Sequence, residues 1–139
     1  MNARICYRSV VFALVGISLS ISTQALSAER ANVIAEGADD YKEYCSACHG
    51  PEGRGDGKMA SILVKPPTDL TGIAKPSGRF SFWRVYDIIA GDVSVPGHDT
   101  FQMPHYAKRL RADESKPGFL PAHIRILLLT HYLESLQEQ

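Results

Sequence analysis

Two cysteines and a histidine lie within one short segment, Cys45-Ser46-Ala47-Cys48-His49. The spacing C-x-x-C-H is typical of the covalent attachment site of a c-type haem, where each thiol adds across one vinyl group of the porphyrin. The histidine after the second cysteine then supplies an imidazole nitrogen to the iron. Two intervening residues suit one helical turn, which presents both sulfurs to one edge of the macrocycle. We therefore predict that Cys45 and Cys48 hold haem c and that His49 binds its iron.

Other kinds of C-x-x-C site remain open at this point. The motif forms half of many zinc sites, but zinc takes four ligands and the chain has no second cysteine pair. It is also the redox pair of thioredoxin-like proteins, but that fold needs a βαβ unit and the sequence shows almost no strand pattern. An ordinary disulfide between Cys45 and Cys48 is the third alternative. The first two lack their usual context, which favours haem.

The chain begins with a segment typical of a secretory signal peptide. Arg4 and Arg8 form a short basic start, and an apolar run follows over residues 10–21. Small residues suited to cleavage come next, so we predict a signal peptide over residues 1–28 and an exported domain over residues 29–139. The apolar run is about a dozen residues, whereas roughly 20 span a bilayer. We therefore expect a periplasmic protein without stable membrane insertion after cleavage; an uncleaved anchor is the alternative.

The cysteine count and the charge limit what the exported domain can bind. Cys6 would leave with the signal peptide, so haem would use both remaining thiols and leave none for a disulfide. The chain has 15 Lys and Arg against 15 Asp and Glu, whereas nucleic-acid-binding domains are usually strongly basic. We expect no nucleic-acid partner. A domain this small builds a modest core, part of which a haem would fill.

The hydrophobic pattern predicts an all-α domain. Apolar residues at helical spacing, followed by Gly91, predict a helix over residues 81–90, and a proline near the first position begins another over residues 121–136. A first helix is expected over residues 29–47 and a short one over residues 59–63. The expected inner stripe of the last helix is Ile124, Leu127, Leu128, Tyr132 and Leu136. On the first helix, Asp40 is expected on the solvent side.

The iron face opposite His49 needs a ligand of its own, and Met103 is the best candidate. It lies on a loop that Pro104 makes rigid, with aromatic residues around it. A thioether sulfur favours the ferrous state, so His/Met ligation raises the reduction potential. His98 and His105 flank Met103, and either would give bis-histidine ligation instead.

These features together resemble the class I monohaem cytochrome c family of bacteria. Gly37 and Tyr41 lie eight and four residues before Cys45, where that family has a glycine and an aromatic residue. Tyr132 matches the aromatic residue of the family's last helix. The resemblance implies the class I cytochrome c fold, with three to five helices and long loops around one covalently bound haem. It also implies that the first and last helices cross at Gly37.

The resemblance also implies roles for the iron ligands and their surroundings. His49 would be the proximal ligand and Met103 the distal one. The carbonyl group of Pro66 or Pro67 would accept a hydrogen bond from the other nitrogen of His49. The chain departs from the family pattern over residues 111–120, which form a longer and looser stretch than is usual there.

The resemblance implies a periplasmic carrier that shuttles single electrons between redox partner proteins and catalyses no reaction itself. We expect a monomer or a loosely associated subunit. Two alternatives remain: a haem c subunit that accepts electrons in a dehydrogenase or reductase, and a five-coordinate haem enzyme or gas-binding protein in which Met103 does not bind the iron. The candidates for a docking patch are Lys108, Arg109 and Arg111. The candidates for binding the haem propionates are Arg79, Trp83 and Arg84.

Overall fold

The computed structural model describes residues 26–93, 95, 106–115, 118 and 120–137. Its regular structure over these ranges is helical, without a strand, as the sequence predicts. Residues 33–139 form one compact unit, and the segment before residue 33 belongs to a separate unit. No helix in the described ranges is both long and apolar enough to cross a membrane. The predicted distal ligand Met103 and its rivals His98 and His105 lie outside the described residues, as does most of the predicted signal peptide.

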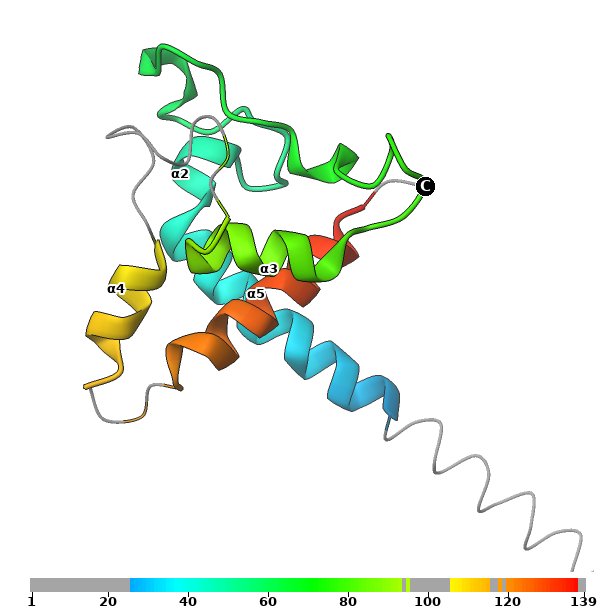
Figure 1. Ribbon diagram of the computed structural model, residues 1–139, viewed down its shortest axis with the longest axis vertical. Helices are drawn as coiled ribbons and strands as arrows, with labels where there is room; N and C mark the ends of the chain where they lie inside the picture. The colour runs from blue at the N-terminus through cyan, green and yellow to red at the C-terminus, as the bar shows by residue number, and fades with distance from the viewer. Residues whose placement is uncertain (1–25, 94, 96–105, 116–117, 119, 138–139) are drawn as a thin grey trace, which may run out of the picture. The chain divides into compact units, whose positions relative to one another are not determined.

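The first helix covers residues 26–44 and leads through Cys45 into the attachment motif. The elements that follow are α2 (Ser46–His49), the 3-10 turns η1 (Ala60–Ile62) and η2 (Leu70–Gly72), α3 (Phe82–Ala90), α4 (Tyr106–Asp113) and α5 (Ala122–Ser135) (Figure 1). The helix α3 ends where predicted, because Gly91 takes the left-handed conformation at φ 86° and its N–H donates to the carbonyl of Ile88. Pro121 directly precedes α5, where its missing N–H costs no helical hydrogen bond.

The first helix and α5 cross at Gly37, as the family resemblance implies. A Cβ atom on residue 37 would overlap the carbonyl group of Leu128 and lie 2.9 Å from Cβ of Tyr132. Beside this contact the rings of Tyr41 and Tyr132 pack with their centroids 5.1 Å apart. The crossing places the helix that carries Cys45 directly against α5.

The predicted inner stripe of α5 is only partly confirmed: Tyr132 and Leu136 pack against the core, but the most buried residues are others. The apolar residues of α5 that are buried are Ala122, Ile126, Leu129 and Leu133. The predicted residues are only half-buried. The reason is that α5 packs on several sides: Leu129 and Leu133 join a core cluster with Tyr41 and Val85, and Ala122 and Ile126 join a second cluster with residues of α4. A helix that is apolar nearly all round carries no single stripe for a sequence pattern to reveal.

The helix α4 was not predicted, and three of its residues fall in the stretch 111–120 that the sequence suggested was loose. Only Ala107 and Leu110 are buried in it, and they pack against Ala122 and Ile126 of α5. The charged residues Lys108, Arg109 and Arg111 are exposed on its other side. Two inward positions in eight residues are too few for a clear helical pattern, so this helix depends on its contacts with α5.

Candidate functional site

The attachment motif continues the helical geometry of the segment before it. The N–H of Cys45 donates to the carbonyl of Tyr41, and the N–H of His49 donates to the carbonyl of Cys45, each at 2.9 Å. Cys45 and Cys48 are both half-buried free cysteines, so the disulfide alternative does not describe this structure. Across the described part of the chain, no group of three or more Cys, His, Asp or Glu residues gathers that could hold a metal, so a zinc site is not formed there.

A glycine-rich loop after His49 folds back onto the motif. The N–H of Gly57 donates to the carbonyl of Cys48 at 3.1 Å, and the N–H of Met59 donates to the carbonyl of Ala47 at 2.8 Å. A Cβ atom on residue 57 would lie 2.6 Å from the carbonyl atoms of Cys48, so only glycine allows this approach. The loop therefore satisfies the carbonyl groups that the end of α2 leaves without helical partners.

The imidazole of His49 is buried and held in one orientation. Its Nδ1 lies 2.9 Å from the carbonyl oxygen of Thr68. A carbonyl oxygen only accepts, so Nδ1 carries the hydrogen and donates it, and Nε2 keeps its lone pair. Burial lowers the pKa of His49, although the hydrogen bond to Thr68 raises it, so the ring is neutral at neutral pH. A buried neutral imidazole with Nε2 unprotonated is in the state that binds a metal.

The partner of His49 corrects one expectation from the sequence. The family resemblance implied the carbonyl group of Pro66 or Pro67, but the accepting carbonyl belongs to the next residue, Thr68. The turn that follows helps to fix Thr68, because the carboxylate of Asp69 accepts hydrogen bonds from the backbone N–H of Thr71 at 2.8 Å and from its hydroxyl at 2.7 Å. The acceptor is therefore the carbonyl of Thr68 and not that of a proline, and the turn at Asp69 helps to hold it in position.

His49 and Cys45 line a cavity of about 200 Å³. Apart from Thr68, the other described walls are apolar and come from the η2 region, α3, the segment after it and α5: Leu70, Ile73, Val85, Ile88, Ile89, Val95, Leu129 and Leu133. An apolar cavity with an oriented imidazole and a thiol in its wall suits a flat hydrophobic ring that carries a metal. The residues present therefore fit a haem c. Cys48 is half-buried on α2, outside the lining of this cavity.

The thiol of Cys45 lies in surroundings that suppress its ionisation. Burial, and after it the charges of Asp40 and Cys48, raises the pKa of the Cys45 thiol to about 12. The thiol is therefore protonated at neutral pH. A thioredoxin-like pair needs a thiolate as its nucleophile, so Cys45 is unsuited to that role.

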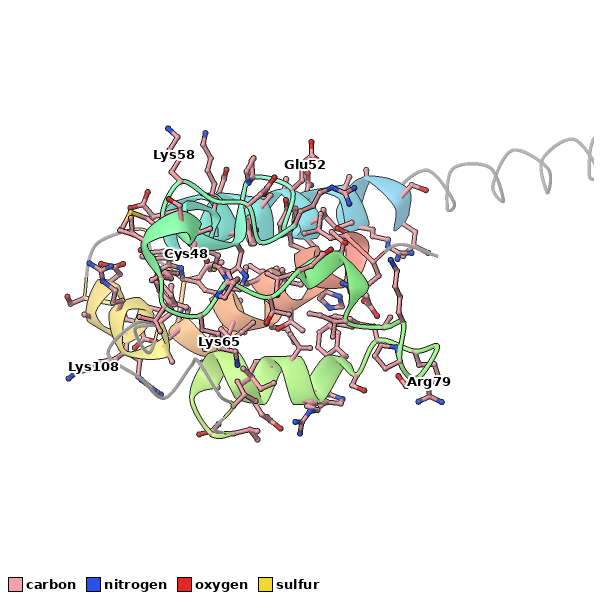
Figure 2. All side chains as sticks on the ribbon, turned by 90° about the horizontal axis from the view of Figure 1, so that it is seen from above. Cys48, Glu52, Lys58, Lys65, Arg79 and Lys108 are labelled. Atoms are coloured by element: carbon pink, nitrogen blue, oxygen red, sulfur yellow. The ribbon has the colours of Figure 1, made fainter. Side chains whose placement is uncertain are left out.

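The predicted propionate-binding residues do not reach this cavity. Arg79, Trp83 and Arg84 are exposed, and none of them lines it. Figure 2 shows Arg79 at the end of the molecule away from Cys48. Trp83 packs instead against the rings of Phe82 and Tyr86, at centroid distances of 5.4 and 5.8 Å.

One buried charged group was missed entirely by the sequence reasoning. Arg125 of α5 is only 6% exposed, and its Nε donates to Asp40 at 3.0 Å. The placement of Asp40 on the solvent side is therefore wrong, because this carboxylate turns toward α5. The two residues are 85 positions apart, so no local pattern signals the pair.

Comparison with known proteins identifies the family. The family model for cytochrome c matches residues 34–116, which is more than half of the chain. No curated protein and no solved structure matches it. The helical fold, the C-x-x-C-H motif and the cavity beside His49 agree with the family model. The chain therefore belongs to the cytochrome c family, whose members bind haem c covalently and transfer electrons, and it has the all-α class I fold of that family.

Proposed function

We propose that this protein is a periplasmic electron carrier with a single haem c, bound through Cys45 and Cys48 and ligated by His49 and Met103. The observation that carries the proposal is the orientation of His49, whose Nε2 is unprotonated and whose ring lines an apolar cavity beside Cys45. The haem supplies the one-electron chemistry of its iron when bound. The protein's part is to fix the ligands, exclude water and allow brief contact with redox partners.

The residues around His49 serve electron transfer in two ways. The hydrogen bond to Thr68 holds the ring in place and raises the basicity of Nε2, which strengthens its bond to iron. The apolar walls from α3 and α5 keep water away from the ring, so few dipoles need to reorient when the charge changes. The thioether of Met103 would be the second iron ligand, which would leave no site for a substrate.

The surface of α4 supports transient docking. Lys108, Arg109 and Arg111 are all exposed on this short helix. Figure 2 shows Lys108 toward the end of the molecule that holds Cys48, opposite Arg79. Electron-transfer complexes use small interfaces, and surface charge mainly speeds their encounter. We propose that this patch guides an acidic partner toward the haem-bearing end.

The decisive experiment is expression of the full chain together with a haem-maturation system. Acidified acetone should leave the pigment on the polypeptide, and a C45S/C48S variant should lose it. The oxidised protein should show the weak near-infrared band of Met–Fe ligation, and the reduced protein should not bind CO. Loss of that band in Met103→Ala but not in His98→Ala or His105→Ala would identify the distal ligand. A pigment that washes out, or ready CO binding by the parent, contradicts the carrier.

The location is tested on the same cells. The full chain should be recovered in the periplasmic fraction with its first residue near position 29, while a chain without residues 2–28 should stay in the cytoplasm without attached haem. A processed, haem-bearing protein that stays in the membrane fraction after a salt wash would favour an anchor instead.

A further inference from the structure

A buried ionic cluster joins the first helix, α4 and α5 behind the attachment motif. The guanidinium of Arg125 forms a bidentate ion pair with the carboxylate of Asp40. Its Nε donates to one oxygen at 3.0 Å, and a second nitrogen donates to the other oxygen. Another nitrogen of Arg125 lies 3.7 Å from Asp113 of α4. The three side chains are 7%, 14% and 15% exposed, so water screens them poorly.

Tyr44 connects this cluster to the attachment motif. Its hydroxyl donates to Asp113 at 2.7 Å and accepts from Arg125 at 3.5 Å. The guanidinium also lies over the ring of Tyr44, 5.5 Å from its centroid. Tyr44 directly precedes Cys45 in the chain, so the cluster begins one residue from the first attachment position.

The charges of the cluster lie close to the attachment motif. Among the described residues it brings one cation together with two carboxylates, so each of the three charges acts from a poorly solvated place. Asp40 precedes Cys45 by five residues, which is about 7.5 Å along a helix axis. At that distance, and with little water between them, the field of this carboxylate reaches the attachment site. A negative charge near a haem stabilises its ferric state relative to its ferrous state.

We propose that the Arg125–Asp40–Asp113 cluster sets the reduction potential of the haem, with Arg125 offsetting two carboxylates that would otherwise hold the iron ferric. This inference rests on the proposed electron-carrier function. Arg125 acts on the haem through the field and through Asp40 and Asp113, so it is a positioning residue.

The test compares variants that break the same ion pair from opposite sides. Asp40→Asn removes a negative charge and should raise the midpoint potential of the purified holoprotein, while Arg125→Gln removes a positive charge and should lower it. Each shift should correspond to roughly a threefold to tenfold change in the ratio of ferrous to ferric haem, up to 59 mV for a one-electron couple. A purely structural defect, such as water entry, would move both variants in the same direction.

Three further variants complete the design. Asp113→Asn leaves the Asp40–Arg125 pair intact and should also raise the potential, which covers the case that Asp40→Asn or Arg125→Gln fails to fold. Arg125→Lys keeps the charge and should restore most of the parent potential. Asp39→Asn is the matched control, because Asp39 is exposed on the same helix and water screens its charge.

The outcomes separate this inference from the proposed function. Midpoint potentials that rise in Asp40→Asn and fall in Arg125→Gln, each by more than the change in Asp39→Asn, support the cluster's role. Potentials that move in the same direction in Asp40→Asn and Arg125→Gln, or by no more than in the control, overturn it. In that case, covalent pigment and a reversible one-electron couple in the parent would leave the carrier function intact. A parent protein without covalent haem would contradict the proposed function itself.

Discussion

The backbone of Gly37 lies so close to the carbonyl group of Leu128 that no side chain fits between the first helix and α5. The contact positions both walls of the candidate haem site, because the first helix leads into Cys45 and α5 supplies Leu129 and Leu133 to the cavity. The rings of Tyr41 and Tyr132 continue the same interface at 5.1 Å. One absent side chain thus determines how the attachment motif faces the apolar walls.

Gly37→Ala should destabilise the protein. Alanine favours a helix over glycine by about 1 kcal/mol, but its Cβ would overlap the carbonyl of Leu128, and overpacking of this kind costs about 1–3 kcal/mol or more. Because the overlap is with backbone atoms, the cost should lie at the upper end of that range, about 3 kcal/mol, so we expect a net loss of about 2 kcal/mol in the free energy of unfolding, measured by denaturant titration of the holoprotein.

Gly72→Ala is the matched control for that substitution. A Cβ on residue 72 would meet only a side-chain carbon of Lys75, at 3.6 Å, which is an ordinary contact. The free energy of unfolding of this variant should lie within about 0.5 kcal/mol of that of the parent. Equal stability of Gly37→Ala and Gly72→Ala would show that the helices separate at little cost, and that the crossing does not depend on glycine.

Tyr41 links the crossing to the loop after His49, and its removal should change the alkaline stability. The hydroxyl is buried and donates to the carbonyl of Gly50 at 2.6 Å. Burial is the main cause that raises the pKa of Tyr41 above its ordinary value of 10.0. Below pH 10 the hydroxyl is neutral in both states, so Tyr41→Phe should cost only the hydrogen bond, about 1 kcal/mol.

Above pH 10 the parent should lose stability faster than Tyr41→Phe. Tyr41 ionises first in the unfolded chain, so the unfolded state binds fewer protons and stability falls as the pH rises. The parent should therefore lose up to about 1.4 kcal/mol per pH unit more than Tyr41→Phe does. The measurement is the free energy of unfolding between about pH 9 and about pH 11, roughly one unit either side of the ordinary tyrosine pKa, and parallel curves for the two proteins would contradict the prediction.

Local sequence signals identified the parts of this molecule whose causes are local. The ends of α3 and α5 follow from Gly91 and Pro121, which limit the backbone wherever they stand. The attachment motif needs only residues that are adjacent in the chain. Gly37 was interpretable because its cause, a helix crossing, recurs throughout the family that the chain resembles.

The features that were missed depend on residues far apart in the chain. From the sequence alone Arg125 is expected at the surface, because its partner Asp40 is far away in the chain. The buried face of α5 depends on which helices surround it. The short helix α4 has only Ala107 and Leu110 to bury, and both need α5 as a partner. The partner of His49 is a backbone carbonyl, Thr68, which no side-chain pattern can encode.

The turn at Asp69 should influence the haem through His49. The carboxylate of Asp69 accepts two hydrogen bonds from Thr71, and this turn follows the carbonyl of Thr68 that holds the histidine ring. In Asp69→Ala the carbonyl should be held less firmly, the hydrogen bond to Nδ1 should weaken and the imidazole should become a less basic ligand. A less basic ligand stabilises ferric iron less, so the midpoint potential should rise.

Asp69→Asn separates the turn from the charge. An amide oxygen can accept the same two hydrogen bonds, but the variant loses the negative charge as Asp69→Ala does. The potential of Asp69→Ala should therefore lie above that of Asp69→Asn, as measured by spectroelectrochemistry. Identical potentials for the two variants would assign the whole effect to charge and none to the position of Thr68.

The exposed basic residues of α4 should control the rate of electron transfer to charged partners. Lys108, Arg109 and Arg111 all lie on the short helix α4. Figure 2 shows Lys108 toward the end of the molecule that holds Cys48. Neutralising all three to Gln should slow oxidation by the ferricyanide anion a few-fold at low salt, because the encounter loses its attraction. The rate should also depend less on ionic strength than it does in the parent.

A cationic oxidant, tris(phenanthroline)cobalt(III), gives the opposite expectation. The triple variant should react with it faster than the parent, since a repulsive charge has been removed. The control triple variant, with Lys75, Arg79 and Arg84 changed to Gln, has the same net charge, but Arg79 lies at the far end from Cys48 (Figure 2). If net charge alone governs the encounter, both triple variants should change the two rates equally. A larger change in the α4 variant with both oxidants would therefore mean that electrons leave the protein near α4, whereas equal changes would contradict a docking patch there.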